Sequence, residues 1–205
     1  MTVTGGDVDA AVASLRGGGL AVIPTDTVYG LACDPYRADA VARLSEVKGR
    51  SPEQPVALVA SSVEVLFDVL PELDGRLRRV VSELLPGPYT LVLPNPAQRF
   101  PWLTGSRPET LGARVPDVRG LARTLLEMLG AVAATSANVH GGADPRRVTD
   151  VPPEIVSVAV AVDGGELAGT PSTVLDLTGP EPTVLREGAV AAADALAAVH
   201  RLVGK

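Results

Sequence analysis

Apolar residues recur at two different spacings along the chain, and the spacing predicts which segments are helices and which are strands. Residues 8–15 have helical spacing, with apolar side chains three and four residues apart, and three consecutive glycines follow them. The same spacing predicts further helices at residues 41–47, 63–70, 73–85, 118–129 and 189–203. Asp117 directly precedes the helix at 118–129, so we expect Asp117 to be its N-cap.

Short apolar runs bounded by glycine or proline predict the strands. They lie at residues 20–23, 56–59, 89–93, 111–115, 131–134, 156–162, 173–177 and 183–185. Helices and strands alternate early in the chain, and strands cluster in its last third. This order predicts an α/β fold with a mixed sheet flanked by helices. Because no linker is long enough to divide the chain, we expect residues 1–205 to form a single domain.

An excess of acidic residues narrows the range of functions. The 205 residues include 18 Lys and Arg against 24 Asp and Glu, which gives a net charge of −6. General nucleic-acid binders neutralise phosphates with basic residues, and single-strand binders stack bases on aromatic side chains. The net charge and an aromatic content of 3% therefore argue against strong direct nucleic-acid binding.

One cysteine and two histidines leave little scope for disulfide or metal chemistry. Cys33 alone excludes an intrachain disulfide and a cysteine-cluster metal site, and with only His140 and His200 a zinc enzyme is not expected. We therefore assign no metal ligands, and we expect Cys33 to be a small core residue and His140 a solvated turn residue. The N-terminus lacks the pattern of a signal peptide, and no apolar run approaches the roughly 18 residues that span a bilayer. We expect a cytoplasmic protein without membrane attachment.

Polar and charged residues collect where the predicted strands end. They are Thr25, Asp26, Thr27, Lys48, Arg50, Thr110, Arg114, Thr135, Ser136, Asn138, Ser172, Thr173 and Arg186. Ligands bind at strand ends in open α/β sheets, and four cations there in an acidic protein suggest a small anion such as a phosphate or a carboxylate. Turn caps and surface salt bridges would place the same residue types there, so the pattern alone leaves both interpretations open.

The common motifs of nucleotide-binding proteins and serine hydrolases are absent from the sequence. There is no GxxxxGK[ST], no GxGxxG after a strand and no GxSxG. The glycines at 17–19 precede a strand, where the end of a helix explains them better. We therefore expect neither a P-loop nor a Rossmann site.

Seven short strings, in a fixed order, carry a resemblance to one family. They are PTDTVYGLA at residues 24–32, KGR at 48–50, PGPYTLVL at 86–93, ARVP at 113–116, TSAN at 135–138, STVLD at 172–176 and LREG at 185–188. The ordered set resembles the threonylcarbamoyl-AMP synthase family, the YrdC/Sua5/TsaC group, over about residues 8–190. The chain is similar to the short form of that family, without the extra C-terminal domain of the Sua5-type members.

This resemblance implies a fold and a reaction. The fold is a twisted mixed α/β sheet that encloses a positively charged cavity. The reaction joins L-threonine, bicarbonate or CO₂, and ATP into L-threonylcarbamoyl-AMP and releases pyrophosphate, which makes the enzyme a nucleotidyltransferase. Mg²⁺ is expected to arrive with ATP, held by phosphates and water. A partner tRNA threonylcarbamoyl transferase then uses the product to modify an adenosine of certain tRNAs.

The resemblance also implies roles for individual residues. Lys48 and Arg50 match the family's KxR pair and are the expected catalytic residues, placed against the triphosphate or the carbamate. The expected contacts of L-threonine are Thr27, Arg114, Ala134 and Ser172, with the Arg114 guanidinium on the threonine carboxylate. The expected contacts of ATP are Arg50, Gln54, Thr110, Ser136, Asn138, Asp144 and Arg186.

Three positions depart from the family pattern. Gln54 replaces a common asparagine, Val59 replaces a histidine of some members, and His140 occupies a serine position. Two other functions stay open at this point. One is a carbamoyl-adenylate-forming enzyme of the same fold, whose chains carry additional domains. The other is a non-catalytic RNA-binding module.

Overall fold

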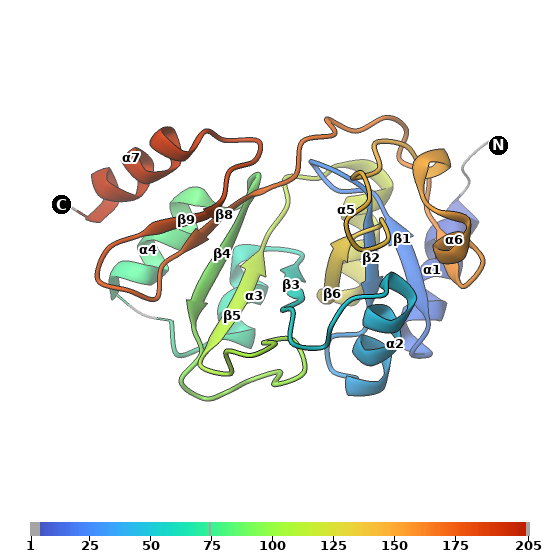
Figure 1. Cartoon of the computed structure of the whole chain (residues 1–205), viewed down its shortest axis with the longest axis horizontal. Coiled ribbons are helices and arrows are strands. Elements are labelled where there is room, and N and C mark those ends of the chain that lie inside the picture. The colour runs from blue at the N-terminus through green and yellow to red at the C-terminus, as the bar shows by residue number, and fades with distance from the viewer. Residues whose placement is uncertain (1–4, 74, 204–205) are drawn as a thin grey trace.

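The computed structural model describes residues 5–73 and 75–203, which form one mixed sheet with helices packed against it (Figure 1). The elements in chain order are α1 (Gly5–Arg16), β1 (Leu20–Ile23), β2 (Gly30–Cys33), α2 (Ala38–Lys48), β3 (Ala57–Ala60), α3 (Val63–Val69), α4 (Gly75–Leu84), β4 (Tyr89–Pro94), β5 (Thr110–Arg114), α5 (Gly120–Leu129), β6 (Ala131–Ser136), the 3₁₀ turn η1 (Val148–Asp150), α6 (Pro153–Val156), β7 (Ala159–Ala161), β8 (Thr173–Asp176), β9 (Thr183–Arg186) and α7 (Ala192–Val203).

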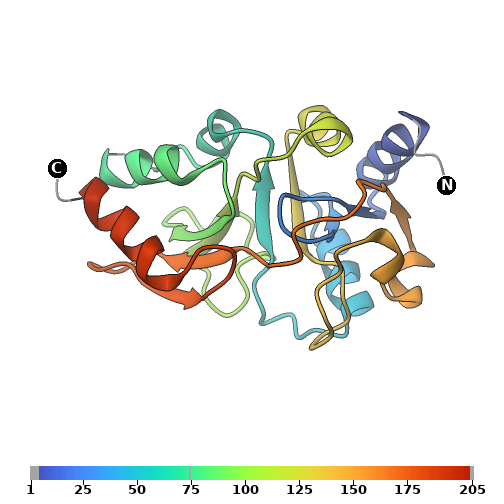
Figure 2. The same cartoon turned by 90° about the horizontal axis from the view of Figure 1, so that it is seen from above.

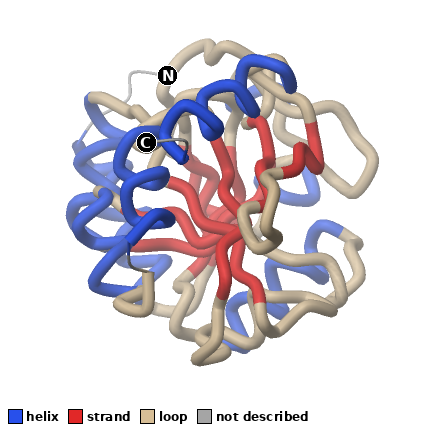
Figure 3. Tube along the Cα trace, turned by 90° about the vertical axis from the view of Figure 1, so that its left-hand side faces the viewer, coloured by secondary structure: helices blue, strands red, loops and turns tan. Residues whose placement is uncertain are grey.

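The sheet has the strand order β7-β1-β2-β6-β3-β5-β4-β8-β9. Three neighbouring pairs are parallel, namely β1 with β7, β3 with β5, and β4 with β8, and the other five pairs are antiparallel. Seen from one end, the strands fan out strongly, which shows the twist of the sheet (Figure 3). The expected α/β fold with a mixed sheet flanked by helices is therefore confirmed.

Strands β1 and β2 are covered on both faces, and all of their residues are buried. Ala21 and Ile23 belong to a core cluster with α1 and α5. The alternate residues Leu20 and Val22 pack in the larger core cluster, which includes side chains of α2 and α6. Continuous apolar runs are typical of strands that are buried on both faces, so the LAVI run of β1 reflects this double cover.

Strands β4 and β5 lie on the other side of β3 and are covered on one face. Leu91 and Leu93 of β4 are fully buried in the core, whereas Thr90 and Val92, which alternate with them, are partly exposed. Successive side chains of a strand point to opposite faces, so one face of this half of the sheet packs on the core. The opposite face borders the cavity described below.

Residues 162–172 connect the two halves of the sheet by crossing from β7 to β8 (Figures 1 and 2). The buried Tyr29 hydroxyl holds this crossing segment, because it donates to the Gly165 carbonyl at 2.7 Å and accepts from the Gly164 N–H at 2.9 Å. Farther along, the Gly169 N–H donates to the Thr27 carbonyl at 2.8 Å. These bonds fix the segment that leads into Ser172.

The loop between β4 and β5 connects the two halves on another side, through aromatic contacts. Three of the six aromatic residues of the chain gather here, since the ring centroid of Phe100 lies 5.3 Å from that of Tyr36 and 6.4 Å from that of Trp102. The Trp102 indole N–H donates to the Pro35 carbonyl at 2.8 Å. At the next residue of the loop, the Leu103 carbonyl accepts a hydrogen bond from the Val56 N–H at 2.9 Å.

Most of the predicted elements lie where the periodicity places them, and three predictions need correction. β2 was not predicted. Its four residues, Gly30–Cys33, directly follow a polar turn, and they are too few to show a strand pattern of their own. The predicted strand at 156–162 is reduced to Ala159–Ala161, since α6 occupies residues up to Val156.

Asp117 does not cap a helix, contrary to the prediction. α5 begins three residues later, at Gly120, and its N-cap is Arg119, whose side chain makes no capping bond. The Asp117 N–H instead donates to Oδ2 of Asp26 at 3.2 Å. The sequence could not reveal this, because the acceptor comes from a residue 91 positions away in the chain. As to membranes, none of the helices in the described ranges is long and apolar enough to cross one.

Candidate functional site

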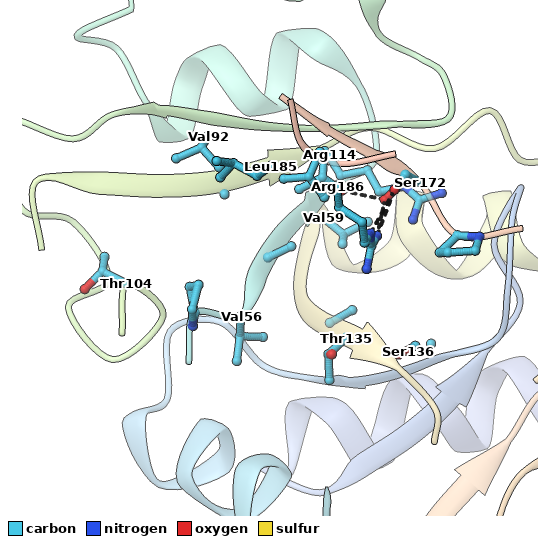
Figure 4. Close-up of a pocket in the computed structure, with 18 of the residues that line it drawn as sticks. Val56, Val59, Val92, Thr104, Arg114, Thr135, Ser136, Ser172, Leu185 and Arg186 are labelled. Atoms are coloured by element: carbon cyan, nitrogen blue, oxygen red, sulfur yellow. Dashed lines mark hydrogen bonds between the residues drawn. The ribbon is translucent and has the colours of Figure 1, made fainter. Parts of the chain in front are cut away.

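A cavity of about 330 Å³ lies against the half of the sheet that helices cover on one face only (Figure 4). Thr110, Gly112 and Arg114 of β5 line it, whereas Leu111 and Ala113 between them lie in the core. Strand periodicity therefore divides β5 into one face that stabilises the fold and one that borders the cavity. The residues before β3, the end of β6 and the β8–β9 pair supply the remaining walls.

Seven of the twelve site residues that the sequence predicts line this cavity. They are Arg50, Thr110, Arg114, Ala134, Ser136, Ser172 and Arg186. Figure 4 shows Arg114, Arg186 and Ser172 together at one end, with Thr104 at the other and with Thr135 and Ser136 on a separate wall. The cavity thus brings together residues that are up to 136 positions apart in the sequence.

Arg114 is a buried guanidinium at the cavity wall. Its Nη2 donates to Oδ1 of Asp26 in an ion pair and to Oγ1 of Thr27 at 2.7 Å. Burial lowers the pKa of Arg114, the Asp26 carboxylate opposes that shift, and the charge of Arg186 adds to it. The Nε of Arg114 is buried without a partner. A buried N–H without an acceptor costs free energy, which a bound acceptor would recover.

Thr27, a predicted threonine contact, lies behind Arg114 and not on the cavity wall. It is 1% exposed, and its hydroxyl accepts from Arg114. The Oγ1 atoms of Thr25 and Thr27 lie 3.1 Å apart, and Oγ1 of Thr25 accepts from the backbone N–H groups of Thr27 and Val28. The turn after β1 is therefore held by its own side chains.

Arg186 and Ser172 form a second polar group beside Arg114. Nη2 of Arg186 donates to the Ser172 carbonyl at 2.8 Å and to the Ser172 hydroxyl at 3.2 Å. That hydroxyl also lies 2.8 Å from Oγ1 of Thr90 on β4. These bonds connect β4, β8 and β9 at the end of the cavity where the arginines meet.

Arg50 lines the wall opposite to these residues. Its Nη1 donates to Oγ1 of Thr135 at 3.1 Å and its Nη2 donates to the Pro55 carbonyl at 2.8 Å. Its Nε is buried without a partner, and burial lowers the pKa of the guanidinium. Arg50 and Arg114 thus share one property, an N–H group that no protein atom among the described residues satisfies.

Lys48 lies under the loop that follows β6 and does not line the cavity. The side chain is buried, and its ammonium donates to the carbonyl of Ser136, to the carbonyl of Asn138 at 2.6 Å and to Oδ1 of Asn138 at 2.9 Å. All three hydrogens are therefore used. Burial, together with the charge of Arg50, lowers the pKa of Lys48 to about 8, and the Asp144 carboxylate opposes this shift.

The other predicted contacts that do not line the cavity surround this lysine or Arg50. Asn138 is buried, and its Oδ1 accepts from Ser136 Oγ at 2.7 Å as well as from Lys48. Gln54 has a buried Oε1 without a partner. Asp144 acts on Lys48 through its charge. Lys48 therefore anchors the loop 135–144. The ligand contacts of Gln54, Asn138 and Asp144 remain predictions.

Four polar cavity residues were not identified from the sequence, namely Thr90, Thr104, Ser106 and Arg107. Thr90 lies within the PGPYTLVL string, and its place on the polar face of β4 could have been inferred from the alternation. The other three belong to an irregular loop without periodicity. Arg107 is half-exposed and pairs with Asp176 at 3.0 Å.

The departures from the family pattern fall in different environments. Val59 lines the cavity as an apolar wall residue. His140 is exposed, as expected of a turn residue, and its N–H donates to the Lys48 carbonyl at 2.9 Å. Cys33 is fully buried in the core, as expected, and burial raises the pKa of its thiol to about 12.

The described part of the chain contains no group of three or more His, Cys, Asp or Glu side chains that could hold a metal ion. The cavity instead offers guanidinium groups with unused N–H donors, hydroxyls and an apolar floor. Guanidinium forks match carboxylates and phosphates. The arrangement suits a ligand with anionic groups and an apolar portion.

Comparison with known proteins gives consistent matches over most of the chain. Residues 13–188 match the sequence model of the Sua5/YciO/YrdC family, described as "Telomere recombination". A threonylcarbamoyl-AMP synthase of Xanthomonas campestris is 37% identical over 166 residues, which cover 80% of this chain and 88% of the relative.

Two solved structures extend this similarity to the fold. P. abyssi Sua5 in complex with L-threonine has a TM-score of 0.80 at 30% identity; the match covers 96% of this chain and 57% of that one. The chain therefore spans little more than half the length of this structural relative. E. coli YciO has a TM-score of 0.75 at 28% identity, with 92% of each chain covered.

Proposed function

The chain belongs to the Sua5/YciO/YrdC family, and from this membership we infer that it is an enzyme, an L-threonylcarbamoyl-AMP synthase that acts in tRNA modification. The substrates are L-threonine, bicarbonate or CO₂, and ATP, and the products are threonylcarbamoyl-AMP and pyrophosphate. As the adenylyl group moves to the carbamate, the enzyme is a nucleotidyltransferase.

The observation that carries this proposal is Arg114 at the wall of the cavity beside Arg186, where its Nη1 has no hydrogen-bond acceptor among the described residues. The carboxylate of an amino acid would supply an acceptor for this donor and a negative charge beside the two neighbouring guanidinium groups of Arg114 and Arg186. The relative P. abyssi Sua5 was solved with L-threonine, which supports an amino acid as the ligand. Ser172 and Ala134, on the same cavity, would complete the contacts with threonine.

The chemistry requires anions to approach one another. The neutral amine of threonine attacks CO₂ and loses a proton, or attacks bicarbonate, from which water leaves, and either route gives the carbamate. A carbamate oxygen then attacks the α-phosphorus of ATP, which breaks the bond to the pyrophosphate leaving group. Both reactants of the second step are negatively charged, so fixed cations lower its barrier by offsetting their repulsion and by aligning them. Arg50 and Arg186, which both line the cavity, would do this, with Thr110, Ser136 and Arg114 on the same cavity.

Lys48 would contribute through the loop that it holds. Its three hydrogens already go to oxygens of Ser136 and Asn138, so it fixes the backbone that presents Ser136 to the cavity. Gln54, Asn138 and Asp144 would support the nucleotide from the same region.

Mg²⁺ would enter bound to the phosphates of ATP, since the described residues offer no metal-binding cluster of their own. The product would pass to a tRNA threonylcarbamoyl transferase, in the cytoplasm.

The deciding experiment measures pyrophosphate release from ATP, with threonine and bicarbonate each present or withheld. We expect release only when all three substrates are present, and mass spectrometry should detect threonylcarbamoyl-AMP. Release that needs carbamoyl phosphate instead would replace this function with carbamoyl-adenylate formation. If no combination releases pyrophosphate, the proposed synthase activity is wrong.

A further inference from the structure

Asp26 is a nearly buried carboxylate to which the proposed reaction assigns no role. Its side chain is 11% exposed, and its two oxygens have different partners. Oδ1 pairs with Nη2 of Arg114, and Oδ2 accepts the backbone N–H of Asp117 at 3.2 Å. Asp26 therefore bridges the guanidinium to the chain that follows β5, although it comes from the turn after β1.

The hydrogen bonds of Arg114 define how its plane is held. Nη2 has two hydrogens, and Asp26 and Thr27 take one each. Because a guanidinium is planar, two acceptors on one nitrogen fix the orientation of the whole group. Nε is buried, and no acceptor among the described residues contacts Nη1, so Nη1 remains as the donor for a ligand in the cavity that Arg114 lines.

The charges around Arg114 make a counter-ion necessary. Arg114 is buried beside Arg186, and both burial and the charge of Arg186 lower the pKa of Arg114, whereas Asp26 raises it. A buried charge that loses its only partner becomes strongly unfavourable. Without Asp26, the guanidinium would gain by turning away from Arg186 toward solvent.

We propose that Asp26 is a positioning residue, which holds the Arg114 guanidinium so that its Nη1 faces the cavity and receives the carboxylate of the amino-acid substrate. This rests on the proposed function, because it takes L-threonine as the ligand of Arg114. Asp26 does not touch the substrate and acts through Arg114.

A double-mutant cycle tests the action through Arg114. L-Threonine binding is measured by calorimetry for the wild type, Asp26→Ala, Arg114→Ala and the double variant. We expect each single variant to bind threonine at least tenfold more weakly, and the double variant to bind no more weakly than Arg114→Ala. Asp26→Asn, which retains an acceptor for Nη2, should recover part of the loss. The proposal would be overturned if the double variant lost threonine affinity by the product of the two single-variant losses, or if Asp26→Ala bound threonine as tightly as the wild type.

A matched control separates positioning from a general loss of charge. Asp176 is also a largely buried carboxylate paired with a cavity arginine, Arg107, at 3.0 Å. Asp176→Asn should leave threonine affinity within twofold of the wild type. Equal losses from Asp176→Asn and Asp26→Ala would contradict a specific role of Asp26.

A spectroscopic measurement addresses the position of Arg114 without any substrate. The ¹⁵N–¹H signal of Arg114 Nε can be identified by its absence in Arg114→Lys. We expect a protected, slowly exchanging signal in the wild type and a fast-exchanging one in Asp26→Ala. If the wild type fails to bind threonine but shows this difference, the proposed function falls and the positioning stands. An unchanged signal in Asp26→Ala overturns the positioning.

Discussion

Strands β1 and β2 differ from β4 and β5 in what covers their two faces. β1 and β2 lie between α1 and α5 on one face and α2 and α6 on the other, and every residue of both strands is buried. β4 and β5 bury one face, and the other borders the cavity. The two halves belong to one sheet, so the difference comes from the helices and not from the strands.

The difference separates two kinds of polar group. Near the covered half, buried donors are satisfied by the protein, as the three oxygens around Lys48 illustrate. Around the cavity, Arg50 and Arg114 keep N–H groups without partners. Buried polar groups are normally hydrogen-bonded, so the protein pairs these two cavity arginines less completely than it pairs Lys48. The predictions below test this division, beginning with the largest expected effect.

Replacing Lys48 by Met should cause the largest loss of stability. The change removes a buried ammonium and leaves three oxygens without a donor. Each unsatisfied buried acceptor costs about 1–3 kcal/mol. We expect the free energy of unfolding, measured by urea denaturation, to fall by about 4 kcal/mol, the combined effect of three such acceptors.

The control for Lys48 lies on the same helix. Arg43 is exposed on α2, and Arg43→Met should change the free energy of unfolding by less than about 0.5 kcal/mol. A Lys48→Met protein as stable as Arg43→Met would show that the loop 135–144 does not depend on the lysine.

Two adjacent residues of β4 compare the core face with the cavity face. Leu91 is fully buried, and Leu91→Ala should lower the free energy of unfolding by about 3 kcal/mol. Val92 lines the cavity, so Val92→Ala leaves a gap that solvent already reaches, and we expect a loss of less than about 1 kcal/mol. Similar losses in both variants would contradict the assignment of the two faces.

The strands that are covered on both faces and the strands that border the cavity were predicted from the sequence with different success. Short apolar runs located β1, β4, β5 and β6, but the runs did not distinguish strands buried on two faces from strands buried on one. β2 was missed, since its four residues follow a polar turn. The N-terminal limit of α5 was also wrong. Its boundary depends on Asp26, a residue distant in sequence, which binds the Asp117 N–H.

Arg50→Ala should reduce activity more than stability. The side chain lines the cavity, so its removal takes charge from the proposed transition state, and water that enters the cavity can replace its hydrogen bonds to Thr135 and Pro55. We expect kcat/KM for pyrophosphate release to fall at least about 100-fold, equal to about 2.7 kcal/mol of transition-state stabilisation. The free energy of unfolding should change by less than about 1 kcal/mol. Near-normal turnover would exclude Arg50 from charge neutralisation.

The candidate site was predictable where it coincides with the quoted strings, and less so elsewhere. Arg114 and Ser172 lie in such strings, and the cavity brings them together. Lys48 lies in one as well, yet its side chain turns to backbone carbonyls that no sequence pattern encodes. Thr104, Ser106 and Arg107 come from a loop shaped by tertiary contacts such as that of Trp102 with Pro35. Their place on the cavity follows from packing alone.

The covered half should also make stability sensitive to alkaline pH. Burial raises the pKa of Cys33 on β2 from 9.0 to about 12 and that of Tyr29, which precedes β2, from 10.0 to about 12. Above pH 9 the unfolded chain therefore loses protons that the folded protein keeps. Since the folded state then binds more protons, stability falls as pH rises toward 12. At pH 10 we expect a loss of roughly 1–2 kcal/mol relative to pH 8.

Urea denaturation of the wild type and of Cys33→Ala at pH 8, 9 and 10 isolates the thiol contribution. Between pH 8 and 10 the variant should lose about 1 kcal/mol less than the wild type, whatever its absolute stability, because it has no thiol to ionise on unfolding. Cavity variants such as Val92→Ala should keep the wild-type pH dependence, as they leave the covered half intact. Parallel curves for Cys33→Ala and the wild type would mean that the thiol of β2 ionises as readily in the fold as outside it. In that case, the two-sided cover of β1 and β2 would not exclude water from Cys33.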